Sequence, residues 1–156
     1  MRNAILIFSL VCLGPFGALA ADGLPRFVSL RSDEVNMRKG PGTQYPVAWV
    51  YVRKSLPVEV TAEYEHWRRI RDSEGDEGWV HKSLLSTRRT VFVIGEERQL
   101  RAAPAADAPV ILRAESGVLA RLLSCHGTWC EVEVSGIGAW IPRQHLWGVY
   151  ADETID

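Results

Sequence analysis

The chain contains two copies of one sequence unit, and this repeat constrains its fold more than any other feature. A shift of 63 residues superposes segment 35–47, VNMRKGPGTQYPV, on segment 98–110, RQLRAAPAADAPV. A shift of 61 superposes Gly-Trp-Val at 78–80 on Ala-Trp-Ile at 139–141. The offset shrinks because loops of the second copy are shorter, and loops tolerate deletions. A chain of 156 residues built this way is predicted to form two very small domains rather than one.

Each copy is composed of short segments that favour β-structure. Runs such as 47–52, VAWVYV, and 57–64, PVEVTAEY, are rich in β-branched and aromatic residues. Stretches of Gly, Pro, Ser and Asp separate these runs. The alternation in PVEV and EVEV predicts strands with one buried and one exposed face, and no window keeps a helical period. About five or six strands in about 60 residues predict an all-β fold, a small barrel or a sandwich.

The start of the chain differs in character from the repeat. Residues 1–20 combine a basic start, MRN, with an apolar core and small residues near the end. This pattern predicts a secretory signal peptide that is cleaved between Ala20 and Ala21. A membrane anchor is the alternative, but Pro15 and Gly17 interrupt a run already shorter than the roughly 20 apolar residues that span a bilayer. We therefore predict an exported protein, periplasmic or otherwise secreted, with no membrane span after cleavage.

Two cysteines remain after this cleavage, Cys125 and Cys130. They lie in segment 122–134, LLSCHGTWCEVEV, which predicts a hairpin with one cysteine on each strand. Opposed residues of an antiparallel pair have Cα atoms about 4.5–5.5 Å apart, which suits a disulfide, and export favours oxidation. A metal site that also used His126 is disfavoured, because three ligands on one tight turn make a poor tetrahedron. We predict a disulfide and no metal site.

The motifs of the first copy resemble those of the bacterial SH3 (SH3b) domain family. An N-x-R-x-G-P opening with a later Tyr-Pro occupies 36–46, a tryptophan strand, HWRRI, occupies 66–70, and EGWVHKSLL follows at 77–85. The second copy resembles a diverged relative that keeps the arginine, two prolines and two tryptophans. It replaces the glycine of Gly-Pro by Ala103 and the aromatic residue by Ala108.

This resemblance implies two tandem SH3-like β-barrels, at 25–86 and 88–150, followed by a flexible tail at 151–156. In the first copy, Val35 and Met37 alternate with polar residues, so this pair is expected to face the barrel core.

The loop that follows, 39–46, contains Gly-Pro-Gly. Gly40 and Gly42 are expected to adopt backbone angles that a β-carbon would forbid, and Pro41 to fix the turn between them.

Aromatic residues supply the candidate ligand-binding face. Tyr45 and Trp49 have no aromatic counterparts in the second copy, where Ala108 and Leu112 stand, so we expect them to bind a ligand. Tyr64 is a further candidate for the same aromatic groove.

Four other tryptophans sit in strands and recur between the copies. We expect these to be structural core residues, since aromatic side chains dominate small cores. They are Trp67, Trp79, Trp129 and Trp140.

Catalysis finds no support in the sequence, and we predict a protein that is not an enzyme and needs no cofactor. Both cysteines are expected to be paired, there is no Gly-x-Ser-x-Gly motif and no His-x-x-x-His spacing. Crowded acids in the turn 73–78 are expected to be solvated. The arginines of segment 66–71 are interpreted as a solvated strand rather than a nucleic-acid site.

The resemblance implies a binding or targeting module of the cell envelope. Its ligand would be a peptidoglycan peptide or an extended segment of an envelope protein. Two alternatives stay open: a structural or assembly subunit of an envelope complex, and a regulator of a cell-wall hydrolase. The first copy carries an excess of basic residues and the second an excess of acidic residues, a difference that would help the two barrels dock or attract different partners.

Overall fold

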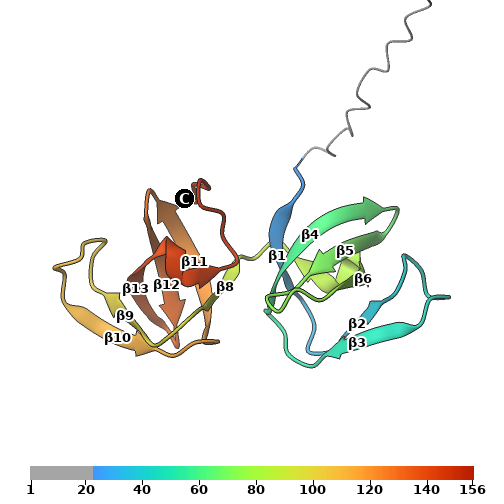
Figure 1. Ribbon diagram of the computed structural model, residues 1–156, viewed down its shortest axis with the longest axis horizontal. Coiled ribbons are helices and arrows are strands. Elements are labelled where there is room, and N and C mark those ends of the chain that lie inside the picture. The colour runs from blue at the N-terminus through green and yellow to red at the C-terminus, as the bar shows by residue number, and fades with distance from the viewer. Residues whose placement is uncertain (1–22) are drawn as a thin grey trace, which may run out of the picture.

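The computed structural model describes residues 23–156, which form two small β-units lying side by side (Figure 1). The predicted signal peptide, 1–20, and its cleavage site at Ala20 and Ala21 lie outside the described residues. Within the described part of the chain, no helix is both long enough and apolar enough to cross a membrane.

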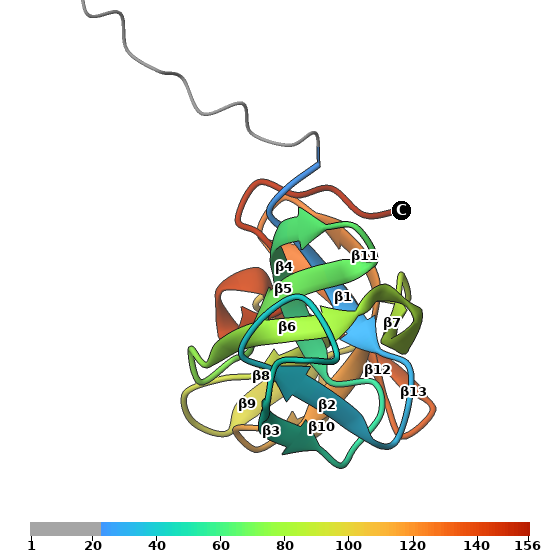
Figure 2. The ribbon, with the colours of Figure 1, turned by 90° about the vertical axis from the view of Figure 1, so that its right-hand side faces the viewer.

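The first unit, barrel 1, is a seven-stranded antiparallel sheet within residues 23–86, with the strand order β3-β2-β6-β5-β4-β1-β7. Figure 2 shows this unit in front, with β6, β2 and β3 facing the viewer. Its elements are β1 (Arg26–Leu30), β2 (Val35–Arg38), β3 (Val47–Tyr51), β4 (Pro57–Tyr64), β5 (Trp67–Arg71), β6 (Glu77–His81), the 3₁₀ helix η1 (Lys82–Leu84) and β7 (Leu85–Ser86).

The second unit, barrel 2, repeats this arrangement in the order β10-β9-β13-β12-β11-β8-β14. The prediction of an all-β chain with two tandem barrels is therefore confirmed. Its elements are β8 (Thr90–Val93), β9 (Arg98–Arg101), β10 (Val110–Ala114), β11 (Leu119–His126), β12 (Trp129–Val134), β13 (Ile137–Pro142), η2 (Arg143–His145) and β14 (Leu146–Trp147).

Each barrel has its own hydrophobic core, formed by the inward positions of the alternating strands. In barrel 1 the buried cluster consists of Val28, Leu30, Val35, Met37, Tyr51, Val58, Val60, Ile70 and Val80. In barrel 2 it consists of Val91, Val93, Leu100, Ala114, Ala120, Leu122, Cys125, Cys130, Val132, Ala139, Ile141 and Leu146. The expected inward pair, Val35 and Met37, belongs to the first cluster.

The four tryptophans that recur between the copies lie half-buried and outside both clusters, so the prediction that they form the core is wrong. They are Trp67, Trp79, Trp129 and Trp140. Three of them directly precede a fully buried residue: Val80, Cys130 and Ile141. Because successive side chains of a strand point to opposite faces, a buried residue at the next position places the tryptophan on the outer face. Trp67 lies three positions before the buried Ile70, which gives the same result.

An aromatic cluster joins the two barrels, and we call this contact between them the joint. Phe27 of β1 lies 5.0 Å from Trp147, edge to face, and 4.7 Å from Tyr150, measured between ring centroids. The Arg89 guanidinium lies 5.9 Å from the centroid of the Phe27 ring. Phe27 is itself buried, although it belongs to neither core cluster. The joint is therefore an apolar contact in its own right, of the kind in which aromatic side chains contribute most area.

Hydrogen bonds surround this aromatic contact. The Tyr150 hydroxyl donates to Glu59 Oε1 at 2.7 Å, and the second oxygen of this buried carboxylate pairs with Arg71. Burial first, and then Glu59, raise the pKa of Tyr150 well above its ordinary value. Thr90 Oγ1 donates to the Ser55 carbonyl at 2.7 Å. Polar groups that the joint buries thus find partners across it, which removes most of the cost of burying them.

The last residues of the chain are held against barrel 2, so the prediction of a flexible tail at 151–156 is wrong. The Cys125 N–H donates to the Ile155 carbonyl at 2.8 Å, and the Ile155 N–H donates back to the Cys125 carbonyl at 3.1 Å. This exchange adds one antiparallel bridge to β11, beyond the residues 119–121 that pair with β8. We call residues 151–156 the strap. The backbone groups of Ile155 are thus satisfied by β11, a pairing that local sequence patterns do not predict.

The disulfide predicted between Cys125 and Cys130 is confirmed. The two residues lie opposite each other on β11 and β12, with Cα atoms 4.1 Å apart, and both are fully buried.

Candidate functional site

One segment of barrel 1 exposes an unusual run of apolar side chains. We call it the β3 surface, and it consists of Tyr45, Val47, Trp49, Val50 and Val52. Trp49 is 57% exposed and Val52 is 78% exposed. Because Trp49 and Val50 are neighbours on a strand, they point to opposite faces, so β3 is exposed on both sides. An apolar strand in this position marks an interaction surface more often than a lone exposed residue does.

The β3 surface also has a free strand edge. β3 stands at the end of the strand order and pairs, within residues 23–156, with β2 alone. Its outer N–H and C=O groups are therefore available to a further strand. Extended peptides dock on such edges through main-chain hydrogen bonds, while side-chain pockets supply specificity.

The loop that precedes β3 is held by an arginine on β2. Arg38 Nη1 donates to the Tyr45 carbonyl at 2.8 Å and to the Thr43 carbonyl at 3.3 Å. In barrel 2, Arg101 Nη1 makes the equivalent bond to the Ala108 carbonyl at 2.8 Å. The arginine of the sequence motif therefore fixes the loop in both copies and is not itself a ligand-binding residue on this geometry.

Tyr45 lies against Gly40, and this contact explains the glycine. A β-carbon at Gly40 would overlap the Tyr45 ring, and one at Gly42 would overlap the Gln44 side chain. Neither glycine has a positive φ, so the expectation of special backbone angles at these two positions is wrong. Glycine is needed at these two positions because there is no space for a side chain. In barrel 2 the ring is absent at Ala108, and Ala103 replaces the glycine.

The structure separates Tyr64 from the other two predicted ligand-binding residues. Tyr64 ends β4 opposite Trp67 and is 54% exposed. Three strands lie between β4 and β3 in the sheet. Tyr45 and Trp49 belong to the β3 surface, whereas Tyr64 lies at the tip of another hairpin.

A groove of about 200 Å³ opens beside β3 and reaches the second barrel. We call it the interbarrel groove. Its apolar wall consists of Trp49, Tyr51, Leu56, Pro57 and Val58 of barrel 1 and Phe92 of barrel 2. Its polar rim is the turn between β5 and β6, with Asp72, Ser73, Glu74 and Asp76. Trp49 is the one predicted site residue that lines it.

Tyr51 connects the wall of the groove to its acidic rim. Its hydroxyl donates to Asp72 Oδ2 at 2.9 Å. Asp72 Oδ1 accepts the N–H groups of Glu74 and Asp76, both at 3.0 Å, so this carboxylate orders the turn. Burial and then Asp72 raise the pKa of Tyr51, and Asp76 and Glu74 raise it further. The hydroxyl therefore stays protonated in a region of negative potential.

Sequence reasoning missed the contribution of this turn. The acids of 73–78 were expected to be solvated, and Tyr51 was not singled out. The sequence did contain one signal, which is a difference between the copies. When the β5–β6 hairpin is aligned with the β12–β13 hairpin through their strand pairing, Asp72 corresponds to Val134 and Asp76 to Ile137.

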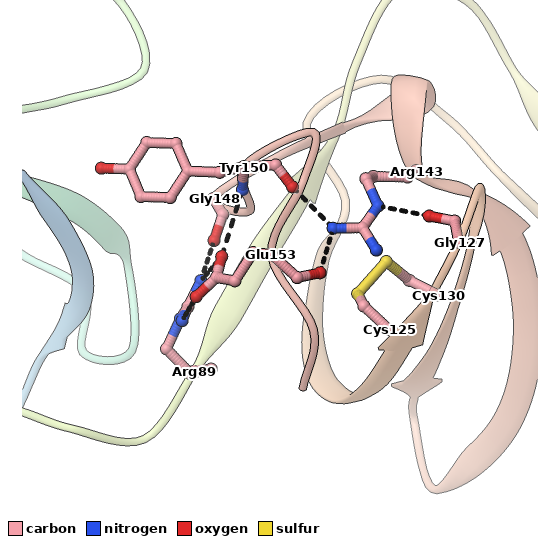
Figure 3. Close-up of a disulfide and its surroundings, with 8 residues drawn as sticks. All are labelled: Arg89, Cys125, Gly127, Cys130, Arg143, Gly148, Tyr150 and Glu153. Atoms are coloured by element: carbon pink, nitrogen blue, oxygen red, sulfur yellow. Dashed lines mark hydrogen bonds and ion pairs between the residues drawn. A yellow bond between two sulfur atoms is a disulfide. The ribbon is translucent and has the colours of Figure 1, made fainter. Parts of the chain in front are cut away.

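Barrel 2 carries a larger groove, of about 480 Å³, beside the strap. Its lining consists of Gly127, Thr128, Trp129, Pro142, Arg143, Gln144, Leu146, Val149 and Ala151. Figure 3 shows how the buried Arg143 spans this region: its Nε donates to the Gly127 carbonyl at 3.0 Å and its Nη1 to the Tyr150 carbonyl at 2.6 Å. Nη1 also donates to the Glu153 carbonyl. These bonds make Arg143 a structural residue that holds the strap.

A second arginine holds the strap from the linker between the barrels. Arg89 pairs with the Glu153 carboxylate and donates to the Gly148 carbonyl at 2.8 Å (Figure 3). Burial alone would raise the pKa of Glu153, but the hydrogen bonds from Arg89 and from the Tyr150 N–H outweigh it and lower the pKa.

Comparison with known families decides what the two barrels are. The sequence profile of the bacterial SH3 domain matches residues 31–87 and 95–148. The chain belongs to the bacterial SH3 domain family. Both matches coincide with the barrels of this SH3 protein, so the resemblance read from its motifs is confirmed in both copies.

Solved structures similar to this SH3 protein include NlpC1 and NlpC2 from Trichomonas vaginalis. Each is 12% identical with a TM-score of 0.37, and each alignment covers 81% of this chain. The alignments cover 48% of NlpC1 and 49% of NlpC2, so the chain spans about half the length of these proteins. No curated protein matches the chain.

Proposed function

We propose that this protein is a non-enzymatic binding module of the bacterial cell envelope, and that barrel 1 binds extended peptides along the β3 surface. The ligand is a peptidoglycan peptide or an extended segment of an envelope protein. Membership in the bacterial SH3 domain family supports the class of function. The β3 surface supports the location, because it combines exposed apolar side chains with a free strand edge.

The observation that carries this proposal is the exposure of Trp49. A 57% exposed tryptophan on an edge strand has no role in the core of its own barrel. The corresponding residue of barrel 2 is Leu112, which packs partly against its core. The fold therefore accepts an aliphatic residue at this position, and the exposed indole needs another explanation. Tryptophan is among the residues that contribute most to binding interfaces.

The proposed location is the periplasm. The disulfide between two buried cysteines supports an oxidising compartment. The first 20 residues support export, since they have the pattern of a signal peptide. Export with cleavage of the signal peptide predicts a mature protein that begins at Ala21. An intact-mass measurement on exported protein checks this start.

A structural subunit of an envelope complex is the competing function, and cell-wall binding distinguishes the two. Purified insoluble cell wall is mixed with the mature protein and sedimented, and the bound fraction is measured. Trp49→Ala is expected to reduce binding by about 2 kcal/mol of affinity, roughly thirtyfold, as loss of an aromatic anchor does.

The matched control for that substitution is Ile137→Ala, which removes a similarly exposed apolar residue at a hairpin of barrel 2. It should leave binding unchanged. If neither the mature protein nor the control is retained by cell wall, the assembly function is the better account.

A further inference from the structure

The acids at the rim of the interbarrel groove lie in a turn and have no basic partner, unlike the three acids that lie within the strands of barrel 1. Glu59, Glu63 and Glu77 each pair with an arginine on a neighbouring strand. Within residues 23–156, Asp72, Glu74 and Asp76 form no ion pair. Three uncompensated negative charges therefore stand at the mouth of an apolar groove, which makes the groove complementary to a cation.

The apolar wall of the same groove offers a second feature that attracts a cation. The Trp49 indole is 57% exposed and lines the groove together with Tyr51. The negative face of an aromatic ring attracts ammonium and guanidinium groups, most strongly when the ring belongs to tryptophan. The lining of the groove therefore offers a cation both aromatic rings and carboxylates.

The size of the groove limits what it can hold. Pockets for whole small molecules have volumes of about 300–1,000 Å³. At about 200 Å³ the interbarrel groove suits one side chain, and the rest of such a ligand must lie outside. The same tryptophan lies in the middle of β3, whose free edge offers that space to an extended backbone.

Barrel 2 shows that the fold does not require these residues. At the positions of Trp49 and Tyr51 it has Leu112 and Ala114, and at the positions of the two aspartates it has aliphatic residues. A core or turn requirement would apply to both copies. The combination of indole, phenol and carboxylates is therefore specific to the groove of barrel 1.

We propose that the interbarrel groove binds the primary ammonium group of a peptide docked along β3, between the Trp49 indole and the carboxylates of Glu74 and Asp76. This inference rests on the proposed function and identifies its ligand chemistry: a cell-wall stem peptide with a free diamino-acid side chain. The ammonium forms charge-assisted hydrogen bonds with the carboxylates, and the peptide backbone adds a strand to the β3 edge.

Two matched peptides test the inference directly. One is a synthetic cell-wall stem pentapeptide with a free lysine ε-amine, and the other is the same peptide acetylated on that amine. Each is titrated into the mature protein, residues 21–156, by calorimetry and by amide NMR shifts. Acetylation is expected to weaken binding about tenfold or more, since it removes the charge and its hydrogen bonds. The free peptide should shift the amides of Trp49, Tyr51 and Glu74.

A double variant tests the acids without disturbing the turn. Glu74→Gln combined with Asp76→Asn keeps Asp72, whose carboxylate orders the turn and accepts the Tyr51 hydroxyl. It should bind the free peptide about tenfold more weakly and the acetylated peptide equally well. The control is Asp107→Asn with Glu115→Gln, which removes the same charge from exposed positions of barrel 2 and should change neither affinity.

The possible outcomes distinguish failure of the ammonium site from failure of the proposed function. Equal affinity for the two peptides, or an unchanged affinity in the Glu74 and Asp76 variant, overturns the ammonium site while leaving cell-wall binding in place. Failure of both peptides and of insoluble cell wall to bind overturns the inference and the proposed function together. Shifts confined to the groove of barrel 2 would also overturn it, because the peptide would then bind elsewhere.

Discussion

The two barrels share a backbone but fill equivalent cross-strand positions with different chemistry. Cys125 and Cys130 of barrel 2 occupy the positions of Glu63 and Arg68 in barrel 1, where an ion pair of 3.1 Å replaces the disulfide. Opposed residues of a hairpin are close enough for either bond. What the fold requires at these positions is a pair, and the nature of the pair is free to change.

A second cross-strand pair makes the same point with its charges exchanged. Glu59 and Arg71 of barrel 1 correspond to Arg121 and Glu133 of barrel 2. In barrel 1 this reversal has a consequence, because Glu59 faces barrel 2 and accepts the Tyr150 hydroxyl. The arginine of barrel 2 points to solvent. Equivalent positions thus serve the joint in one copy and the surface in the other.

Specialisation therefore follows a division between the barrels. Barrel 1 exposes aromatic and aliphatic residues on β3 and collects unpaired acids beside them. The features that distinguish barrel 2 stabilise barrel 2 itself. They are the disulfide, Arg143 and the strap. Four experiments test this division, and the first three compare matched variants.

The largest effect is expected from the shared core. Ile70 is fully buried, and Ile70→Ala should lower the free energy of unfolding by about 2–5 kcal/mol through the cavity it leaves. Its counterpart, Val132→Ala, should cost less because fewer buried atoms are lost. Urea unfolding of the mature protein measures both. Negligible effects of both substitutions would contradict the burial of these two residues in equivalent cores.

The disulfide should contribute less than the core but more than the ion pair that replaces it. Replacing Cys125 and Cys130 by alanine removes a short loop constraint of about 2 kcal/mol. Replacing Glu63 and Arg68 by alanine should cost about 1 kcal/mol or less, because the pair is partly exposed and screened by salt. Thermal melting of both double variants, with and without added salt, checks this order. A greater loss in the Glu63 and Arg68 variant contradicts it.

A double-mutant cycle tests the space that Gly40 leaves for Tyr45. Gly40→Ala should cost about 1–2 kcal/mol by displacing the ring. In a background of Tyr45→Ala, the same substitution should cost almost nothing, because barrel 2 already combines Ala103 with Ala108. The coupling between the two positions is read from unfolding free energies. Additive effects would mean that the glycine is needed for another reason.

The smallest effect concerns Glu153, whose pKa is lowered in the folded state. A lowered carboxyl pKa adds stability above the pKa of the unfolded chain and loses it as the pH falls through the folded value. Glu153→Gln should therefore cost about 1 kcal/mol or less at pH 7, and the difference from wild type should vanish well below about pH 4. Unfolding curves between these pH values measure it. A constant difference across that range would exclude Glu153 as the titrating group.

Local patterns predicted the fold well. The repeat, the alternating strands and the hairpin around the cysteines are properties of neighbouring residues, and each was found as expected. The tryptophans were misplaced because frequency arguments about aromatic cores outweighed the alternation, although the buried valine or isoleucine next to Trp79 and Trp140 already indicated the outer face.

The rest of the site depends on contacts that no local pattern contains. The bond between Tyr51 and Asp72 joins residues from two hairpins, and Phe92 reaches the groove from the other barrel. The strap was expected to be flexible, but Cys125 of β11 and two arginines supply its partners. Such features follow from how the sheets close and dock.

The stack of Phe27, Trp147 and Tyr150 has a consequence for any partner large enough to contact both barrels. Such a partner meets two surfaces whose separation and orientation are already set, so it does not have to order one barrel relative to the other when it binds. The distance between its own contact points then becomes a determinant of affinity, in contrast to modules joined by a flexible linker, which accept a range of spacings at a lower effective concentration.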